Sequence, residues 1–170
     1  NLPSGDNGTG ALRASRRTPD GRTLAAAART VLLWDVHTGR QVGQLGRPNA
    51  PGVQGVQGVK FSPGGKTLAV LDGRWQVSLW DVATSKERLR LGGLKRPAAA
   101  MTFSPDGKVL ATAGGGYEEL SPAYKNFLAE LKLWDTATGK LLRACGGHTF
   151  YVTAVGFSPD GRSLASAGED

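Results

Sequence analysis

Polar and apolar residues alternate in short runs along this chain, which is the pattern of half-buried β-strands. Residues 76–80 (QVSLW) and 87–91 (ERLRL) alternate in this way, with turn-forming residues between them. Residues 152–157 precede a Ser-Pro-Asp-Gly turn, in which proline fixes φ and glycine accepts a tight reversal, and a further run follows at 163–167. The pattern predicts hairpins, four strands to a unit, and almost no helix.

The same sequence unit occurs four times along the chain. Its turn reads RTPDGRTLAA, FSPGGKTLAV, FSPDGKVLAT and FSPDGRSLAS, and the first three copies continue to VLLWDVHTG, VSLWDVATS and LKLWDTATG. The turn prolines follow one another at steps of 44, 42 and 54 residues, at Pro19, Pro63, Pro105 and Pro159. The long last step indicates an insertion of roughly a dozen residues between Ala113 and Glu130, in a period typical of repeat architectures.

The recurring turn and Trp-Asp dipeptide, in that order, resemble the WD-repeat family of β-propellers over residues 17–170. The resemblance implies an all-β fold of four-stranded antiparallel blades. About three and a half to four blades are expected, an incomplete ring with both chain ends cut, because seven blades would need roughly 300 residues. The Ala-, Arg- and Gly-rich repeats resemble bacterial members of the family. The predicted units are a polar segment at 1–9, blades at 10–52, 53–95 and 96–147, and a partial blade at 148–170.

The resemblance also implies structural roles. In WD repeats a histidine, a serine, an aspartate and the dipeptide tryptophan form a hydrogen-bonded tetrad, and His148, Ser166 and Asp170 match its first three members. Ala26, Val70 and Thr112 stand where Ser166 stands, so the other units are expected to rely on apolar packing instead. The dipeptide residues expected to be structural are Trp34, Asp35, Trp80, Asp81, Trp134 and Asp135.

Three sequence patterns resemble a catalytic, phosphate-binding or metal site, but each lacks what such a site needs. His148, Ser166 and Asp170 could be drawn as a hydrolase triad, but the resemblance makes them structural. Residues 65–67 (GKT) imitate a phosphate-binding loop, but the glycine that the pattern needs five places earlier is a lysine. Cys145 has zinc-like spacing to His148, but a structural site needs four ligands. The sequence therefore predicts no enzyme, no metal and no cofactor.

A net charge of +7, from 21 basic and 14 acidic residues, favours an acidic partner. The densest basic run puts Lys86, Arg88 and Arg90 on one side of an outermost strand, where charge deters unwanted sheet pairing. Nucleic acid is not favoured, because no aromatic stacking platform accompanies these charges. No apolar run reaches the length of a membrane span, and the single cysteine favours a reducing, cytoplasmic location.

The loops of the predicted propeller offer a candidate binding surface. The resemblance implies that turns joining second to third strands share one face, the top, with loops joining consecutive units, and these loops differ from unit to unit. Aromatic and basic residues in them are of the types found in binding hot spots. The candidate partner-binding residues are Arg47, Trp75, Lys95, Arg96, Tyr117, Tyr124, Phe127, Phe150 and Tyr151.

The insertion has two alternative forms. It is either a lengthened hairpin that bends at Ser121-Pro122, or a short helix from Ser121 with Tyr124, Leu128 and Leu131 on one side.

The sequence thus predicts a noncatalytic scaffold that binds a protein or an acidic peptide on its top-face loops. The alternative is a regulatory or substrate-presenting propeller within a larger bacterial enzyme, such as a signalling kinase or hydrolase. Self-association that completes the ring is also expected, because the outer faces of the first and last sheets should be apolar and exposed.

Overall fold

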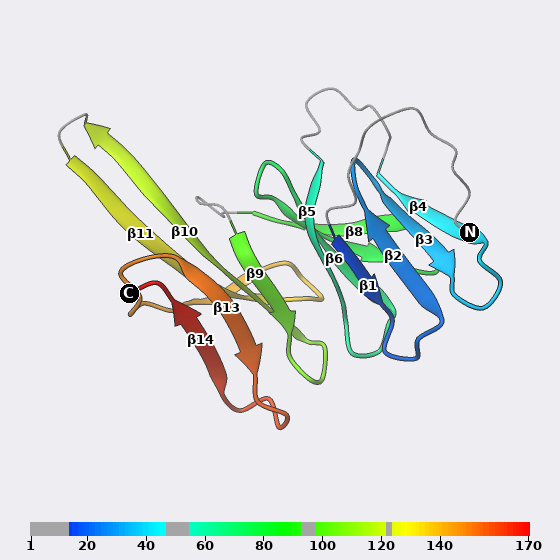
Figure 1. The fold of residues 1–170 in the computed structure, drawn as a ribbon. Helices are drawn as coiled ribbons and strands as arrows, with labels where there is room; N and C mark the ends of the chain where they lie inside the picture. The colour runs from blue at the N-terminus through cyan, green and yellow to red at the C-terminus, as the bar shows by residue number, and fades with distance from the viewer. Residues whose placement is uncertain (1–13, 47–54, 93–97, 122–123) are drawn as a thin grey trace.

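The computed structural model describes residues 14–46, 55–92, 98–121 and 124–170, and every regular element in these ranges is a strand. Three four-stranded antiparallel sheets and one two-stranded sheet lie side by side in chain order (Figure 1). Each sheet falls within one of the four predicted repeat units. The predicted all-β class, with four-stranded antiparallel blades, is confirmed.

Each sheet is a meander in which every strand pairs with its neighbours in sequence. The first sheet is formed by β1 (Ala14–Arg17), β2 (Thr23–Ala27), β3 (Val31–Asp35) and β4 (Gln41–Leu45). The second is formed by β5 (Val56–Phe61), β6 (Thr67–Asp72), β7 (Val77–Asp81) and β8 (Lys86–Leu91). The third is formed by β9 (Ala98–Phe103), β10 (Val109–Ser121), β11 (Tyr124–Asp135) and β12 (Leu141–Ala144), and the fourth by β13 (Val152–Phe157) and β14 (Leu164–Gly168).

A single hydroxyl closes the turn between the first and second strands of a sheet. In the third sheet Ser104 Oγ donates to Asp106 Oδ1 at 2.6 Å and accepts from the backbone N–H of Val109 at 2.9 Å. The same pair of hydrogen bonds recurs at Thr18 in the first sheet and at Ser158 in the fourth. The repeated Pro-Asp-Gly motif therefore reflects hydrogen bonds within the turn itself. These turns lie along the lower edge of the molecule in Figure 1.

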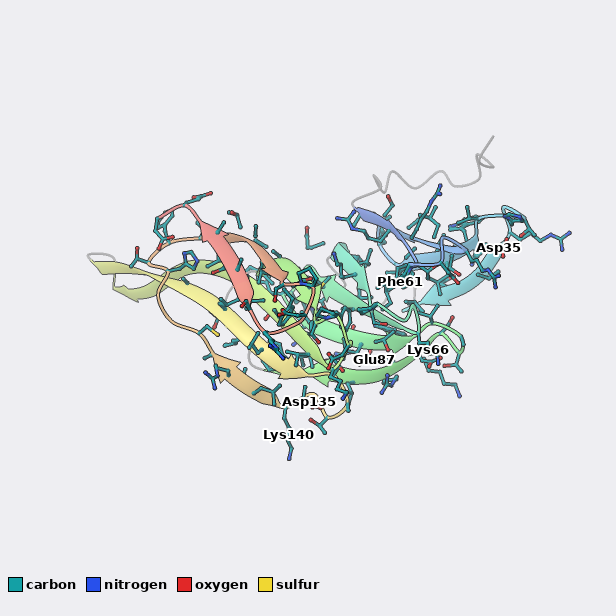
Figure 2. The ribbon with its side chains drawn as sticks, turned by 90° about the horizontal axis from the view of Figure 1, so that it is seen from below. Asp35, Phe61, Lys66, Glu87, Asp135 and Lys140 are labelled. Atoms are coloured by element: carbon teal, nitrogen blue, oxygen red, sulfur yellow. The ribbon has the colours of Figure 1, made fainter. Side chains whose placement is uncertain are left out.

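The aspartate of each Trp-Asp dipeptide closes the turn into the fourth strand. Asp135 Oδ1 accepts from the backbone N–H and the hydroxyl of Thr138, at 2.7 and 2.8 Å. Asp35 and Asp81 repeat this arrangement with the threonines three positions later. These hydrogen bonds hold the pKa of each aspartate below its ordinary value. Figure 2, viewed from below, labels Asp35 and Asp135 in these turns.

The core lies between neighbouring sheets, because each inner sheet buries apolar side chains on both faces. Phe61 and Leu68 are buried in one cluster with residues of the first sheet, and Figure 2 shows Phe61 between these two sheets. Phe103 and Leu110 are likewise buried with residues of the second sheet. We call the face that a sheet turns toward the preceding sheet its leading face.

In the second and third sheets the turn after the dipeptide lies against the outermost strand of the preceding sheet. A Cβ at Gly43 of β4 would lie 2.6 Å from Ser85 Oγ, and a Cβ at Gly139 would lie 3.5 Å from Leu91 Cδ2 of β8. Ser85 has φ 56°, and glycines take the matching turn position in the other units, Gly39 at 65° and Gly139 at 72°. This left-handed conformation lets the turn approach closely, and glycine adopts it without steric cost.

Among the described residues, the leading face of the first sheet differs from the sequence prediction of an apolar surface. Arg17 and Ser15 of β1 are exposed on it, beside the half-buried Leu24 and Trp34. Arg17 pairs with Leu24 in the first sheet as Phe61 pairs with Leu68 in the second. Arg17 therefore has the register position that Phe61 has in the second sheet. The face is therefore mixed, with a cation at its inner edge.

Candidate protein-interaction surface

Trp75 lies in the turn that joins β6 to β7, and one aspartate builds this turn. Asp72 Oδ1 accepts from the backbone N–H groups of Arg74 and Gln76, at 2.8 and 2.9 Å, and the Asp72 carbonyl accepts from the N–H of Trp75 at 3.0 Å. Such aspartate turns are rigid without help from other side chains. The indole is not needed to close the turn, and 44% of Trp75 remains exposed.

The backbone of Trp75 is strained. Its φ is 62°, in the left-handed region that disfavours side chains with a Cβ. A non-glycine residue there costs about 1 kcal/mol or more, and such outliers cluster at functional sites. Trp75 is thus an exposed aromatic residue at a position where glycine would be more stable, which the sequence alone did not reveal.

The insertion of the third unit is a lengthened hairpin, and the alternative of a helix from Ser121 is wrong. β10 has 13 residues and β11 has 12, and they pair throughout, apart from an irregularity near the bend. β9 pairs with β10 only as far as Gly114. Beyond that point the hairpin continues as a two-stranded arm, which Figure 1 shows extending to the side opposite the Pro-Asp-Gly turns. The arm and the Trp75 turn are connections of the same class, from second to third strand.

The aromatic candidates on this arm are placed by their backbone alone. Tyr117 pairs with Phe127 across the hairpin, and Tyr124 pairs with Ser121 beside the bend. Their side chains lie outside the described part of the structure. Their role in binding a partner stays a prediction.

Phe150 and Tyr151 pack against each other. Their rings meet edge to face, with centroids 5.3 Å apart and an interplanar angle of 87°. Both residues are half-buried, and the Tyr151 carbonyl accepts from the N–H of Glu169 at 2.9 Å. This pair therefore orders the loop before β13, and only part of each residue is open to a partner.

The basic candidates are less concentrated than the sequence suggested. Arg47, Lys95 and Arg96 lie outside the described residues. On β8 the expected stripe of Lys86, Arg88 and Arg90 is interrupted, because a bulge opposite β7 breaks the alternation.

Two of these β8 side chains have partners within their own sheet. Arg90 forms a salt bridge with Glu87, with Nη2 2.9 Å from Oε2, and Arg88 Nη1 donates to Thr67 Oγ1 at 3.3 Å. An exposed ion pair of this kind adds little stability. It does reduce the positive charge that β8 offers to a partner.

The three tetrad residues of the last unit are in contact. His148 Nδ1 lies 2.7 Å from Asp170 Oδ1, and His148 Nε2 lies 2.9 Å from Ser166 Oγ. Asp170 Oδ2 also accepts from the backbone N–H of Thr149 at 2.6 Å. Two of these side chains lie so close to Gly168 that a Cβ there would be 2.6 Å from Asp170 Oδ1 and 2.9 Å from His148 Nδ1.

This network has the hydrogen-bond order of a Ser-His-Asp triad, and its contacts also connect two segments of the last unit. The hydrogen bond from His148, followed by that from the Thr149 N–H, lowers the pKa of Asp170 to about 2. A carboxylate only accepts, so the imidazole donates from Nδ1 and its Nε2 can accept the Ser166 hydroxyl proton. The contacts connect the loop before β13 to the end of β14. Asp170 accepts hydrogen bonds from both the His148 imidazole and the Thr149 N–H.

In the third unit one hydrogen bond of this network is kept, which corrects the expectation that apolar packing replaced it there. Trp134 Nε1 donates to Thr112 Oγ1 at 2.9 Å, so threonine serves where serine stands in the last unit. In the second unit Trp80 Nε1 donates instead to Ser78 Oγ at 2.7 Å, two residues earlier in its own strand. In the first unit alanine, Ala26, stands at the position of Thr112. The dipeptide pattern alone does not identify the acceptor.

Two further findings limit the chemistry of the described residues. No group of three or more His, Cys, Asp or Glu side chains is arranged there to hold a metal ion. In the same ranges, no helix has the length and apolar character needed to cross a membrane.

Known proteins resemble this chain over its repeats. Residues 139–170 match the WD40 family, described as WD domain, G-beta repeat. The chain is 34% identical over 144 residues to Nuclear distribution protein PAC1 of Arthroderma benhamiae, covering 83% of this chain and 30% of that protein. It is 29% identical over 114 residues, 66% of this chain, both to Protein groucho of Drosophila melanogaster and to Small ribosomal subunit protein RACK1y of Oryza sativa subsp. japonica, covering 14% and 30% of those proteins. The chain thus spans less than a third of the length of each.

The match of residues 139–170, the similarity to these proteins and the four-stranded antiparallel sheets all agree with the resemblance to the WD-repeat family carried by the repeated turn and dipeptide. The three relatives are eukaryotic and give no support to a bacterial type.

Proposed function

We propose that this chain is a noncatalytic protein-interaction module that binds a protein or peptide through the loops joining second to third strands. Trp75 carries the proposal. It combines 44% exposure with a φ of 62°, on a turn that its neighbours already close. Turn formation does not require a tryptophan at this position, whereas binding favours one, since tryptophan is enriched in interface hot spots.

A rigid turn makes Trp75 a suitable anchor. Because the backbone around it is fixed by Asp72, little conformational entropy is lost when a partner covers the ring. The exposed Arg74 precedes it, and the chain carries a net charge of +7. We therefore propose an acidic partner, with the ring supplying affinity and the charges mainly raising the association rate.

The enzyme-linked alternative has no observation in its favour among the described residues. That alternative places the catalytic domain outside this sequence, so it does not depend on the His148 network. The names of the relatives, a nuclear distribution protein, groucho and a ribosomal subunit protein, are not names of enzymes. We keep a cytoplasmic location as part of the proposal, supported by the free thiol of Cys145.

Replacing Trp75 by glycine separates binding from stability. The melting temperature should stay unchanged or rise by a few degrees, because glycine relieves the strained φ. Capture of partners in a pull-down, identified by mass spectrometry, should fall at least about tenfold if the ring is a hot spot. Trp75→Phe keeps both the ring and the strain and should retain much of the capture.

Two results would contradict this proposal. One is equal recovery of the same proteins by Trp75→Gly and the unchanged chain. The other is an equal loss with Ala137→Gly, which alters a turn of the opposite side.

Self-association remains a separate proposal, supported by the exposed apolar side chains of Leu141 and Leu142 on β12. Sedimentation of the chain at micromolar concentration should show dimers or larger species. A single monomeric species would rule it out.

A further inference from the structure

The turn between β5 and β6, residues 62–67, lacks an aspartate that the matching turns of the other three sheets have. Those three turns, which we call the sister turns, read Thr-Pro-Asp-Gly or Ser-Pro-Asp-Gly, whereas this turn reads Ser-Pro-Gly-Gly, with Gly64 at the aspartate position. The next residue, Gly65, has φ 69°, close to the 73° of Gly107 in the third sheet. The second-sheet turn therefore keeps the left-handed glycine of its sisters and lacks their carboxylate.

In each sister turn this carboxylate joins two donors. Asp106 Oδ1 accepts from the Ser104 hydroxyl at 2.6 Å and from the backbone N–H of Lys108 at 3.0 Å. Asp20 and Asp160 accept from the corresponding hydroxyl and backbone N–H in the first and fourth sheets. These bonds, the hydroxyl first, hold the pKa of each aspartate below its ordinary value. The two donors thus stabilise one ionised carboxylate.

The second-sheet turn has the same two donors. Ser62 is 7% exposed, and its Oγ accepts from the N–H of Thr67 at 3.1 Å. Among the described residues, however, neither the Ser62 hydroxyl nor the backbone N–H of Lys66 donates a hydrogen bond. Buried polar groups in proteins are normally satisfied, and a hydroxyl can donate as well as accept. The donors that share a carboxylate oxygen in each sister turn therefore lack their acceptor here.

Neighbouring turns hold the second-sheet turn on both sides. A Cβ at Gly65 would lie 3.6 Å from Pro19 Cδ of the first sheet's turn, and a Cβ at Gly107 of the third sheet's turn would lie 3.6 Å from Pro63 Cδ. A Cβ at Gly64, in contrast, would meet nothing within 4 Å. A group from outside can therefore approach over Gly64, at the position from which the aspartate reaches the donors in a sister turn.

The charges around this turn favour an anion. Lys66, labelled in Figure 2, is exposed and forms no ion pair within the described ranges. Arg88 Nη1 donates to Thr67 Oγ1 at 3.3 Å, so a guanidinium also lies beside the turn. The carboxylate of Asp81, which pairs with Thr67 across the sheet, accepts from Thr84 in its own turn. In each sister turn the basic residue has an aspartate two positions earlier, and Lys66 has a glycine there.

We propose that the second-sheet turn binds the side-chain carboxylate of an aspartate or glutamate from a partner protein. One carboxylate oxygen accepts from the Ser62 hydroxyl and the Lys66 N–H, as Asp106 Oδ1 accepts from its two donors, and the cations beside the turn add to the attraction. The acidic residue enters over Gly64. This site lies at the end of β6 opposite to the Trp75 turn, so it is separate from the proposed loop site.

Nuclear magnetic resonance of the ¹⁵N-labelled chain tests the proposal with a blocked Gly-Asp-Gly tripeptide as the probe. The Lys66 amide should shift in a saturable way, with a dissociation constant in the millimolar range for so small a ligand. The amides of Arg22, Lys108 and Arg162 already donate to aspartates and should not respond, which makes them controls within the same spectrum. Blocked Gly-Asn-Gly should bind at least about tenfold more weakly, because it lacks the charge.

Gly64→Asp copies the sister turns into the second sheet. Gly64 is not among the glycines with positive φ, so aspartate fits its backbone without strain. The new carboxylate should raise the melting temperature by a few degrees and, by occupying both donors, weaken the tripeptide at least about tenfold. Gly64→Ala is the matched control, because it restricts the unfolded chain in the same way without adding an acceptor. It should raise the melting temperature less and leave tripeptide binding within about twofold.

Four results would overturn the proposal. The first is a Lys66 amide that does not respond to the tripeptide, and the second is an equal shift of the sister amides, which indicates a general charge effect. The third is a loss of binding in Gly64→Ala as large as in Gly64→Asp. The fourth is tighter binding of inorganic phosphate than of the tripeptide, which would make this a phosphate site. Trp75→Gly should leave the Lys66 response unchanged, so failure of the loop site and failure of this site are distinguishable.

Discussion

Replacing Trp134 by alanine should lower the free energy of unfolding by about 3–5 kcal/mol, the range for losing a large buried aromatic side chain. Trp134 is 2% exposed and lies in one cluster with Leu110 and Phe103, between the second and third sheets. Removing the indole leaves a cavity between two flat sheets whose backbones are fixed by their own ladders. The site therefore collapses poorly, and urea unfolding at constant m-value measures the loss.

Thr112→Val separates the hydrogen bond from the packing. Valine keeps the shape of threonine but removes the acceptor of the Trp134 indole N–H, and Thr112 is 0% exposed. The buried donor is then unsatisfied, so the loss should be about 1–3 kcal/mol, smaller than that of Trp134→Ala. Equal losses for the two variants would show that packing contributes nothing, and would contradict the register in which Trp134 faces the second sheet.

The repeated turns explain why the sheets could be predicted. Ser104 forms a hydrogen bond with Asp106, and Asp135 with Thr138, so each pair lies within a few residues of the chain. Such short-range pairs are visible in the sequence as a motif that recurs along the chain. Fold class follows from such local chemistry together with alternating strands. The indole acceptors were missed because they lie at different positions in different units. Thr112 lies on the strand next to that of Trp134, whereas Ser78 lies two residues before Trp80 in the same strand.

The candidate surface was predictable only in part. That Trp75 and the insertion are connections of one class follows from strand order, but the φ of 62° at Trp75 depends on the aspartate turn around it. The helical alternative at Ser121 fails because β10 and β11 extend a ladder already formed below Gly114, whereas a short helix would need its own nucleus. The sequence shows that Arg17 stands where other units have phenylalanine, since RTPDG aligns with FSPDG, but only the burial of Phe61 shows that this position faces a neighbouring sheet.

The stability of the last unit should depend on acid through Asp170. The hydrogen bond from His148 is the main cause that lowers the pKa of Asp170 from 3.8 to about 2 in the folded chain, followed by the bond from the Thr149 N–H. A carboxyl whose pKa is lower in the folded than in the unfolded state stabilises the fold while it is ionised. Its contribution is therefore complete above about pH 3.8, and it is lost as the pH falls toward about 2.

Asp170→Asn isolates this contribution, because asparagine keeps the shape and an acceptor oxygen but does not titrate. The other turn aspartates, such as Asp106 and Asp160, also have lowered pKa values and give an acid response common to both proteins. Thermal unfolding between pH 2 and pH 5 should show a destabilisation of the variant at pH 5 that shrinks steadily toward pH 2. The two curves should converge where Asp170 of the unchanged chain is protonated. Parallel curves over this range would mean that the His148–Asp170 contact does not stabilise the ionised carboxyl, and that the loop before β13 is held by other contacts.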